Sequence, residues 1–257
     1  MKRLRHWVLV LFALSWFGCS SSVNEDGRGC SFICDSIQYR VEFMSAGCVR
    51  ILSYPEGDTL VTKRLVVDTE QPTFKDYRCE ETKQAFVFRT HELSVTFDKE
   101  NAAFTFHEAS TGRLLLKEKD HKKARYFRRS EAGGEQCLEV TQRFIPTADE
   151  AIYGLGQYQN GIMNYRGKSV LLLQANMDIV NPFLVSTNGY GVLWDNYSST
   201  KFEDTDEGYS FTSEVGDASD YYFVYGRSMD AVISGYRELT GGVPMFGKWV
   251  YGFWQSK

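Results

Sequence analysis

The sequence has no excess of positive charge. Its 257 residues contain 29 lysines and arginines against 33 aspartates and glutamates, which gives a formal charge of −4. Binding to the phosphate backbone of a nucleic acid requires a basic surface, so we expect no nucleic-acid partner. A neutral partner agrees better with this charge. Aromatic residues make up 15% of the chain, a proportion that suits both β-strands and carbohydrate sites, where flat apolar rings stack on sugars.

The sequence also lacks the residue spacings that are typical of metal sites. No C-x-x-C pair occurs, and the four histidines, at positions 6, 91, 107 and 121, are scattered along the chain. We therefore expect no metal site and no cofactor. Five of the six cysteines are interpreted as buried thiols with one or two disulfide bonds among them, so at least one of the five stays unpaired.

The apolar run from Trp7 to Phe17 is too short to cross a bilayer. Basic residues precede it and Gly18-Cys19 follows it, which resembles a bacterial export signal that ends in a lipobox. A buried amphipathic helix is excluded because the run is apolar on every face. We expect residues 1–19 to be a lipoprotein signal with an acylated Cys19, and the protein to be exported to the cell envelope. Its lipid would hold it on the membrane, at the periplasmic or outer-membrane face.

A helical hydrophobic stripe is absent from most of the chain. Residues 20–36 begin with a polar stretch that contains two glycines and are predicted to be a flexible tether. Residues 37–243 consist of short segments rich in Val, Ile, Phe, Tyr and Thr that alternate with turn residues, which indicates an all-β sandwich. Strands are expected at about 85–90, 93–98, 103–107, 114–116, 138–145, 169–174, 182–187, 190–195, 209–213 and 220–225. One helix is predicted at 228–239, capped by Ser228.

Two charged segments are interpreted as solvated surface. Residues 117–129 are rich in Lys and Arg, but acidic residues interrupt them, so an exposed hairpin is favoured over a polyanion-binding patch. Residues 203–208 begin like the calcium-binding loop of an EF-hand, but Tyr209 stands where that loop requires glycine. An exposed loop is expected there instead.

The most specific signal is a set of motifs in a fixed order. They are Tyr153–Gln157 (YGLGQ), Asn164–Gly167 (NYRG), Gln174–Asn176 (QAN), Pro182–Ser186 (PFLVS), Gly189–Tyr197 (GYGVLWDNY) and Lys248–Lys257 (KWVYGFWQSK). Each motif alone is weak, but together they strongly resemble glycoside hydrolase family 31. The resemblance extends from about Val41 to the last residue, and the last two motifs are most similar to the α-xylosidases of that family.

The resemblance implies a galactose-mutarotase-like β-sandwich, or supersandwich, that leads into a (β/α)8 barrel. Residues 37–243 would form the sandwich and its helix, and residues 244–257 would begin the catalytic barrel. Trp249–Gln255 is a nearly continuous apolar run, as expected for a parallel strand that is covered on both faces. We expect the chain to stop at this first barrel strand.

The resemblance also implies retaining hydrolysis of an α-glycosidic bond, in which one Asp attacks the anomeric carbon and another acts as acid and then base. Both belong to later barrel strands, so no residue here is assigned a catalytic role and the chain alone is predicted to be inactive. Asn176 and Asp178 match a loop that reaches over the barrel mouth and are candidates for binding sugar hydroxyls, with hairpin capping as the alternative. Trp254 is a candidate sugar platform, with core packing as the alternative.

The whole protein is therefore predicted to be an α-xylosidase-type enzyme whose partners are a xylose-containing oligosaccharide and its own catalytic barrel. Two alternatives remain open: an α-glucosidase of the same family, and a non-catalytic carbohydrate-binding or decayed module. A sugar mutarotase on the same sandwich is disfavoured, because His91, His107 and His121 lie in no recognisable motif.

Overall fold

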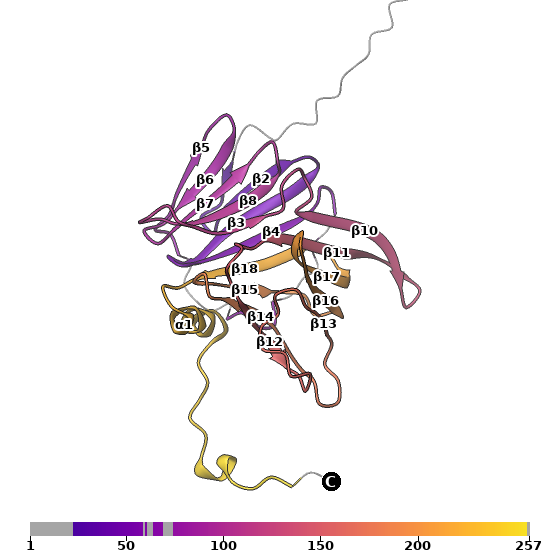
Figure 1. The fold of residues 1–257 in the computed structure, drawn as a ribbon. Coiled ribbons are helices and arrows are strands. Elements are labelled where there is room, and N and C mark those ends of the chain that lie inside the picture. The colour runs from indigo at the N-terminus through magenta and orange to yellow at the C-terminus, as the bar shows by residue number, and fades with distance from the viewer. Residues whose placement is uncertain (1–22, 59, 61–63, 69–73, 256–257) are drawn as a thin grey trace, which may run out of the picture.

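The computed structural model describes residues 23–58, 60, 64–68 and 74–255, which form two packed β-sheets, one α-helix and a C-terminal extension (Figure 1). The prediction of a mainly β fold is confirmed. Residues 1–22, with the expected export signal and Cys19, lie outside the described residues.

The first sheet has eight strands, and all of its neighbouring strands are antiparallel. In spatial order they are β1 (Asn24–Glu25), β2 (Cys30–Cys34), β3 (Ile37–Ser45), β4 (Cys48–Pro55), β18 (Ser219–Tyr225), β15 (Tyr190–Trp194), β14 (Ile179–Ser186) and β12 (Ile152–Gln157). Strands from the two ends of the sequence therefore lie side by side in the centre, where β4 pairs with β18.

The second sheet has ten strands. In spatial order they are β13 (Ser169–Leu172), β16 (Thr200–Thr205), β17 (Gly208–Gly216), β11 (Glu135–Ile145), β9 (Leu114–Glu118), β8 (Ala103–Glu108), β7 (Leu93–Asp98), β6 (Ala85–Arg89) and β5 (Arg78–Glu81), and β10 (Arg125–Ala132) pairs with β11 off this path. The meander from β6 to β9 follows the expected strand positions closely.

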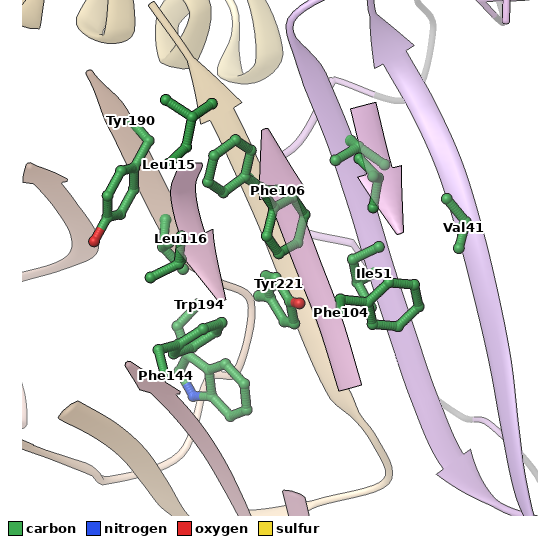
Figure 2. Close-up of a cluster of buried hydrophobic side chains, with 14 of the residues drawn as sticks. Val41, Ile51, Phe104, Phe106, Leu115, Leu116, Phe144, Tyr190, Trp194 and Tyr221 are labelled. Atoms are coloured by element: carbon green, nitrogen blue, oxygen red, sulfur yellow. The ribbon is translucent and has the colours of Figure 1, made fainter. Parts of the chain in front are cut away.

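The main core lies between the two sheets. Along β7, Leu93, Val95 and Phe97 are fully buried while the residues between them are partly exposed. This period of two gives the sheet one apolar face, which packs against the matching face of the first sheet. Phe106 from β8 stacks on Phe223 from β18, with ring centroids 4.2 Å apart. Figure 2 shows part of this core, with aromatic and aliphatic side chains contributed by both sheets.

The outer face of the first sheet is covered by α1 (Met229–Thr240). The Ser228 side chain accepts a hydrogen bond from the amide of Ala231, which confirms the predicted cap. Phe183 from β14 stacks on Tyr236 of the helix at 4.2 Å. Every residue of β18 is buried. Tyr221, Phe223 and Tyr225 lie in the main core, and Tyr222 and Val224 pack in the cluster that includes the helix. Among the described residues, no helix is both long and apolar enough to span a membrane.

The YGLG motif lies at an irregularity in the pairing of β12 with β14, where Leu155 alone stands opposite residues 181–183. The register with β14 shifts between Gly154 and Gly156, and the intervening Leu155 has a positive φ of 66°. A Cβ atom on Gly156, whose φ is 121°, would lie 2.0 Å from the carbonyl oxygen of Ile179. Glycine is required there because the partner strand's backbone approaches too closely for any side chain.

The predicted tether over residues 20–36 was wrong for the part that the structure describes. Residues 24–25 and 30–34 are the strands β1 and β2, and Cys30 and Phe32 are buried. The cause is the alternation Cys-Ser-Phe-Ile-Cys, whose first, third and fifth side chains enter the core. The polar residues before it led to the prediction of a tether instead of this short strand.

The two segments interpreted as solvated are exposed or partly exposed for the most part, but each contains a buried charged residue. Arg125, at the start of β10, is buried and forms an ion pair with the fully buried Glu118. Asp204 lies on β16, where it is 5% exposed and accepts hydrogen bonds from Arg166 and from the amide of Gly167. Both charges enter the protein because strand alternation turns them inward and a partner compensates each one.

The predicted strand at 249–255 is not formed. The structure has a short 3-10 helix, η1 (Lys248–Tyr251), and an irregular chain around it. Figure 1 shows this segment running away from the sandwich after α1. A strand needs a neighbour to pair its backbone groups, and none of the described strands pairs with these residues.

Candidate functional site

A cavity of about 340 Å³ opens beside the connection between β13 and β14. One wall comes from this connection and from the start of β14, and the other comes from the segment that follows β15. Val66 adds an apolar contribution from the connection between β4 and β5. The residues around the cavity are Val66, Leu172, Leu173, Gln174, Val180, Pro182 and 193–200. Its surroundings combine aliphatic side chains with one carboxylate, amides and hydroxyls.

The Trp-Asp-Asn-Tyr motif supplies one wall of the cavity, and two of its members have structural roles. Trp194 is fully buried, donates a hydrogen bond to Ser213 Oγ at 2.9 Å and stacks on Phe211. Asn196 ends the strand: its side-chain oxygen accepts from the amide of Ser198, while its Nδ2 donates to the carbonyl of Val215. These contacts fix the backbone on both sides of Asp195.

Asp195 is 4% exposed and only partly satisfied. Its Oδ1 accepts a hydrogen bond of 2.7 Å from the hydroxyl of Tyr197, and its Oδ2 has no partner within the described residues. Burial raises the pKa of Asp195, and the nearby negative charge of Asp220 raises it further. Burial and the Asp195 carboxylate together raise the pKa of Tyr197 to about 12, so Tyr197 remains a hydrogen-bond donor.

Behind Asp195 lies a buried network of charges on the outer face of the first sheet. Arg50 from β4 forms a two-pronged ion pair with Asp220 from β18 and donates a further hydrogen bond of 2.8 Å to Glu42. Arg64 also contacts Glu42. Tyr197 connects this network to the cavity, because its hydroxyl also accepts a hydrogen bond from the amide of Leu65. Residues from several strands therefore fix the position of the polar side chains beside the cavity.

This arrangement suits binding better than hydrolysis. A retaining glycosidase needs two carboxyl groups about 5–5.5 Å apart that both reach the substrate. Asp220 is 1% exposed and fully engaged with Arg50, so it is unavailable for such a role. Asp195 then remains as a single carboxyl whose free oxygen is itself buried, which leaves the surrounding amides and hydroxyls to hydrogen-bond a neutral polyhydroxylated molecule.

The predicted residues Asn176 and Asp178 lie at the tip of the β13–β14 connection. Ala175 and Asp178 exchange two backbone hydrogen bonds, so Asn176 and Met177 form a tight turn in which Met177 has a positive φ of 69°. Asn176 is exposed and Asp178 is partly exposed. Neither residue lines the cavity, but Gln174 of the same loop does, and its side chain accepts a hydrogen bond from the amide of Val180.

Trp254 is not brought together with these two residues. Its side chain is 67% exposed, and its indole donates a hydrogen bond to the carbonyl of Val250 within the same C-terminal segment. The core-packing alternative for Trp254 is also not seen in the structure.

Sequence reasoning missed Asp195 and Tyr197 as site residues, although both lie in a motif that it singled out. Their signal was a polar pair directly after the buried strand 190–194, and the sequence does not reveal which of the two acids, Asp195 or Asp220, keeps a free oxygen.

A second cluster of residues that could bind a ligand was also missed. Glu25, Cys30 and Cys79 are close enough to share a metal ion, and β1 and β2 lie at the opposite end of the first sheet from the cavity.

The two sheets and the helix that covers one of them define a galactose-mutarotase-like sandwich, the domain class found in carbohydrate-active enzymes. Two solved structures share this fold: an α-xylosidase of glycoside hydrolase family 31 from Xanthomonas citri and one from a soil metagenome, the latter complexed with xylose. Each has a TM-score of 0.78 and 22% identity and covers 91% of this chain, which spans 42% and 36% of the two proteins, respectively.

The chain belongs to the family of glycosyl hydrolase 31 N-terminal galactose mutarotase-like domains, whose model matches residues 38–203. It is 36% identical over 237 residues to an α-xylosidase of Saccharolobus solfataricus, covering 86% of this chain and 31% of that protein. An α-glucosidase of Bacillus thermoamyloliquefaciens is 29% identical over 246 residues, covering 88% of this chain and 29% of that protein. The chain thus spans about three tenths of the length of these relatives, and the resemblance to the family stated above is confirmed.

Proposed function

We propose that this chain is the N-terminal region of a retaining α-glycosidase of the α-xylosidase type, which acts on xylose-containing oligosaccharides. The observation that carries the proposal is the 36% identity to an α-xylosidase over 86% of the chain. The charge balance supports it, because a net charge of −4 suits a neutral sugar better than a polyanion. In this proposal the catalytic acid pair belongs to a (β/α)8 barrel outside this chain.

The sandwich contributes binding contacts rather than chemistry. We assign these contacts to the β13–β14 loop, where Asn176 and Asp178 present an amide and a carboxylate to solvent at the end of a tight turn. Gln174 and Val180 link the base of this loop to the cavity wall. A loop that is hydrogen-bonded at its base and across its turn can contact sugar hydroxyls with little loss of conformational entropy.

The activity is tested on the whole protein that contains this chain, with aryl α-xylosides and aryl α-glucosides as substrates. We expect kcat/KM to be higher for the xyloside, and the isolated 257-residue chain to show no turnover above a blank preparation. A preference for the glucoside would favour the α-glucosidase alternative. Oligosaccharide binding with no turnover by the whole protein would support a non-catalytic module and contradict the proposal.

The loop is tested with Asn176→Ala and Asp178→Ala in the same whole protein. Each variant should lower kcat/KM for an oligosaccharide by about 10-fold or more, the effect of losing a hydrogen bond to a charged or well-oriented group. Asp206→Ala is the matched control, because Asp206 is an exposed aspartate in the β16–β17 turn. Trp254→Ala tests the sugar platform in the same assay. Unchanged kinetics in all three site variants would contradict the assignment.

We further propose that the protein is an exported lipoprotein of the cell envelope, attached to the membrane through Cys19. The support is the order of a basic start, a short apolar run and Gly18-Cys19. Cys19→Ala should release the protein from the membrane fraction, and mass spectrometry of the wild-type chain should find a lipid on Cys19. Equal membrane association of the variant would contradict this proposal.

A further inference from the structure

Two thiols and a carboxylate meet where an edge of the first sheet approaches an edge of the second. Glu25 from β1 and Cys30 from β2 are register partners, and Cys79 lies on β5, the last strand of the second sheet. The Cys30 Sγ lies 3.9 Å from Glu25 Oε1 and 3.9 Å from the hydroxyl of Tyr77. One ligand atom from each of Glu25, Cys30 and Cys79 lies within 4.8 Å of the other two.

These separations are close to those of a bound tetrahedral metal ion. Zinc binds thiolate sulfur at about 2.3 Å and carboxylate oxygen at about 2.0–2.2 Å, so its ligand atoms lie roughly 3.5–3.8 Å from one another. Small side-chain movements would bring all three atoms into range. Both Cys30 and Cys79 are free thiols in the structure, and soft thiolate ligands favour zinc or monovalent copper over calcium or magnesium.

Burial and charge around the three residues also suit a cation. Cys30 is fully buried, Cys79 is partly buried and Glu25 is exposed, which leaves an open side for entry and for a water ligand. The negative charges of Glu25, Glu80 and Glu81 all act on the Cys79 thiol.

We propose that Glu25, Cys30 and Cys79 bind a thiophilic divalent cation of the zinc class, with water as a fourth ligand, and that this ion joins the edges of the two sheets. Binding releases the two thiol protons to solvent and leaves the oxidation states of metal and sulfur unchanged. The ion would also stabilise β1, which pairs with β2 through only two residue pairs, Asn24–Ser31 and Glu25–Cys30. The absence of a short Cys-x-x-Cys spacing does not exclude such a site, because its ligands come from three separate strands.

The site is tested with the reduced full chain in the absence of oxygen, using Co²⁺ as a spectroscopic probe and Zn²⁺ as a competitor. We expect one Co²⁺ per chain, a sulfur-to-cobalt charge-transfer band in the near ultraviolet, and loss of that band when Zn²⁺ is added. Cys79→Ser and Glu25→Gln should each weaken binding by about 10-fold or more, since even residues that merely orient metal ligands contribute 10–100-fold. Cys79→Ser should also reduce the charge-transfer intensity, which Glu25→Gln should leave largely intact.

Cys137→Ser is the matched control, because Cys137 is also a free, partly buried thiol on a β-strand of the second sheet. This variant should bind Co²⁺ like the wild-type chain. Added Zn²⁺ should raise the unfolding temperature of the wild type and of Cys137→Ser but not of Cys79→Ser. Absence of a charge-transfer band in a folded, reduced protein would overturn the proposal. A Cys30–Cys79 disulfide in the chain isolated under non-reducing conditions would overturn it as well, because the pair would then serve as a covalent cross-link.

Discussion

Two buried carboxylates, Glu118 in the interior of the sandwich and Asp195 beside the cavity, differ in how fully their oxygens are hydrogen-bonded. Glu118 is fully buried and accepts hydrogen bonds from Arg125, Gln142, the hydroxyl of Tyr221 and a backbone amide. Asp195 is almost as buried but keeps one oxygen without a partner in the described residues. A saturated buried charge is costly to break, whereas an unsaturated one is itself a cost that the folded state carries.

The largest effect is expected from Glu118→Ala, which breaks the saturated network. Removing one partner leaves the Arg125 guanidinium buried and uncompensated, so the free energy of unfolding should fall by about 3–5 kcal/mol. Urea denaturation measures this loss. Glu139→Ala is the control, because Glu139 pairs with the exposed Arg128; it should cost at most about 1 kcal/mol. Equal losses in the two variants would remove the distinction between interior and surface pairs.

A smaller effect is expected from Tyr197→Phe. This change removes the hydroxyl that donates to Asp195 and accepts from the amide of Leu65. We expect a loss of about 1–2 kcal/mol in the free energy of unfolding, because two hydrogen bonds with a typical net value of about 1 kcal/mol each are removed. The pKa of Asp195 should rise further in this variant, because the hydroxyl favours the ionised form. NMR titration of the Asp195 carboxyl would measure that shift, and a lower pKa would contradict the described geometry.

Asp195→Asn should have a smaller effect on stability and one of opposite sign at neutral pH. The raised pKa of Asp195 means that the folded state holds this proton more tightly than the unfolded state. Stability from this group is therefore present below the ordinary carboxyl pKa of about 4 and is lost as pH rises through the folded value. Asn cannot ionise, so the variant should gain stability relative to the wild type between pH 4 and 7. Parallel stability curves for the two proteins would show that Asp195 is not perturbed.

The smallest effect on stability is expected from removing residues 244–257. This segment extends the comparison to a region whose side chains pack little against the sandwich. Met245, Trp249 and Phe253 are 92%, 76% and 91% exposed. Their deletion should leave the unfolding temperature of the sandwich unchanged and raise solubility, because exposed apolar side chains promote self-association. A drop of many degrees in differential scanning calorimetry would place this segment in the core and move the domain boundary beyond residue 243.

The strands that sequence reasoning located well are those with strict alternation, such as β7 and β8, in which buried and partly exposed residues follow a period of two. Strands β10 and β16 were not located because charged residues interrupt them, and the burial of Arg125 and Asp204 depends on partners that are distant in sequence. Asp195 could be located within a motif but not recognised as unsaturated, since that property depends on Arg50 having paired with Asp220 instead. The Trp249–Gln255 run did not become a strand because a strand also requires a neighbour, which hydrophobicity alone does not provide.

The irregular backbone of the YGLG segment in β12 has a consequence for how copies of this protein meet in solution. β12 is the outermost strand at its end of the first sheet, and such a strand presents unpaired amides and carbonyls that another chain could extend. Gly154, Leu155 and Gly156 all have positive φ values and Leu155 is buried, so the hydrogen-bonding groups on the outer side of β12 lose their regular spacing. The glycines that permit this backbone conformation therefore discourage a second molecule from adding a strand at this position.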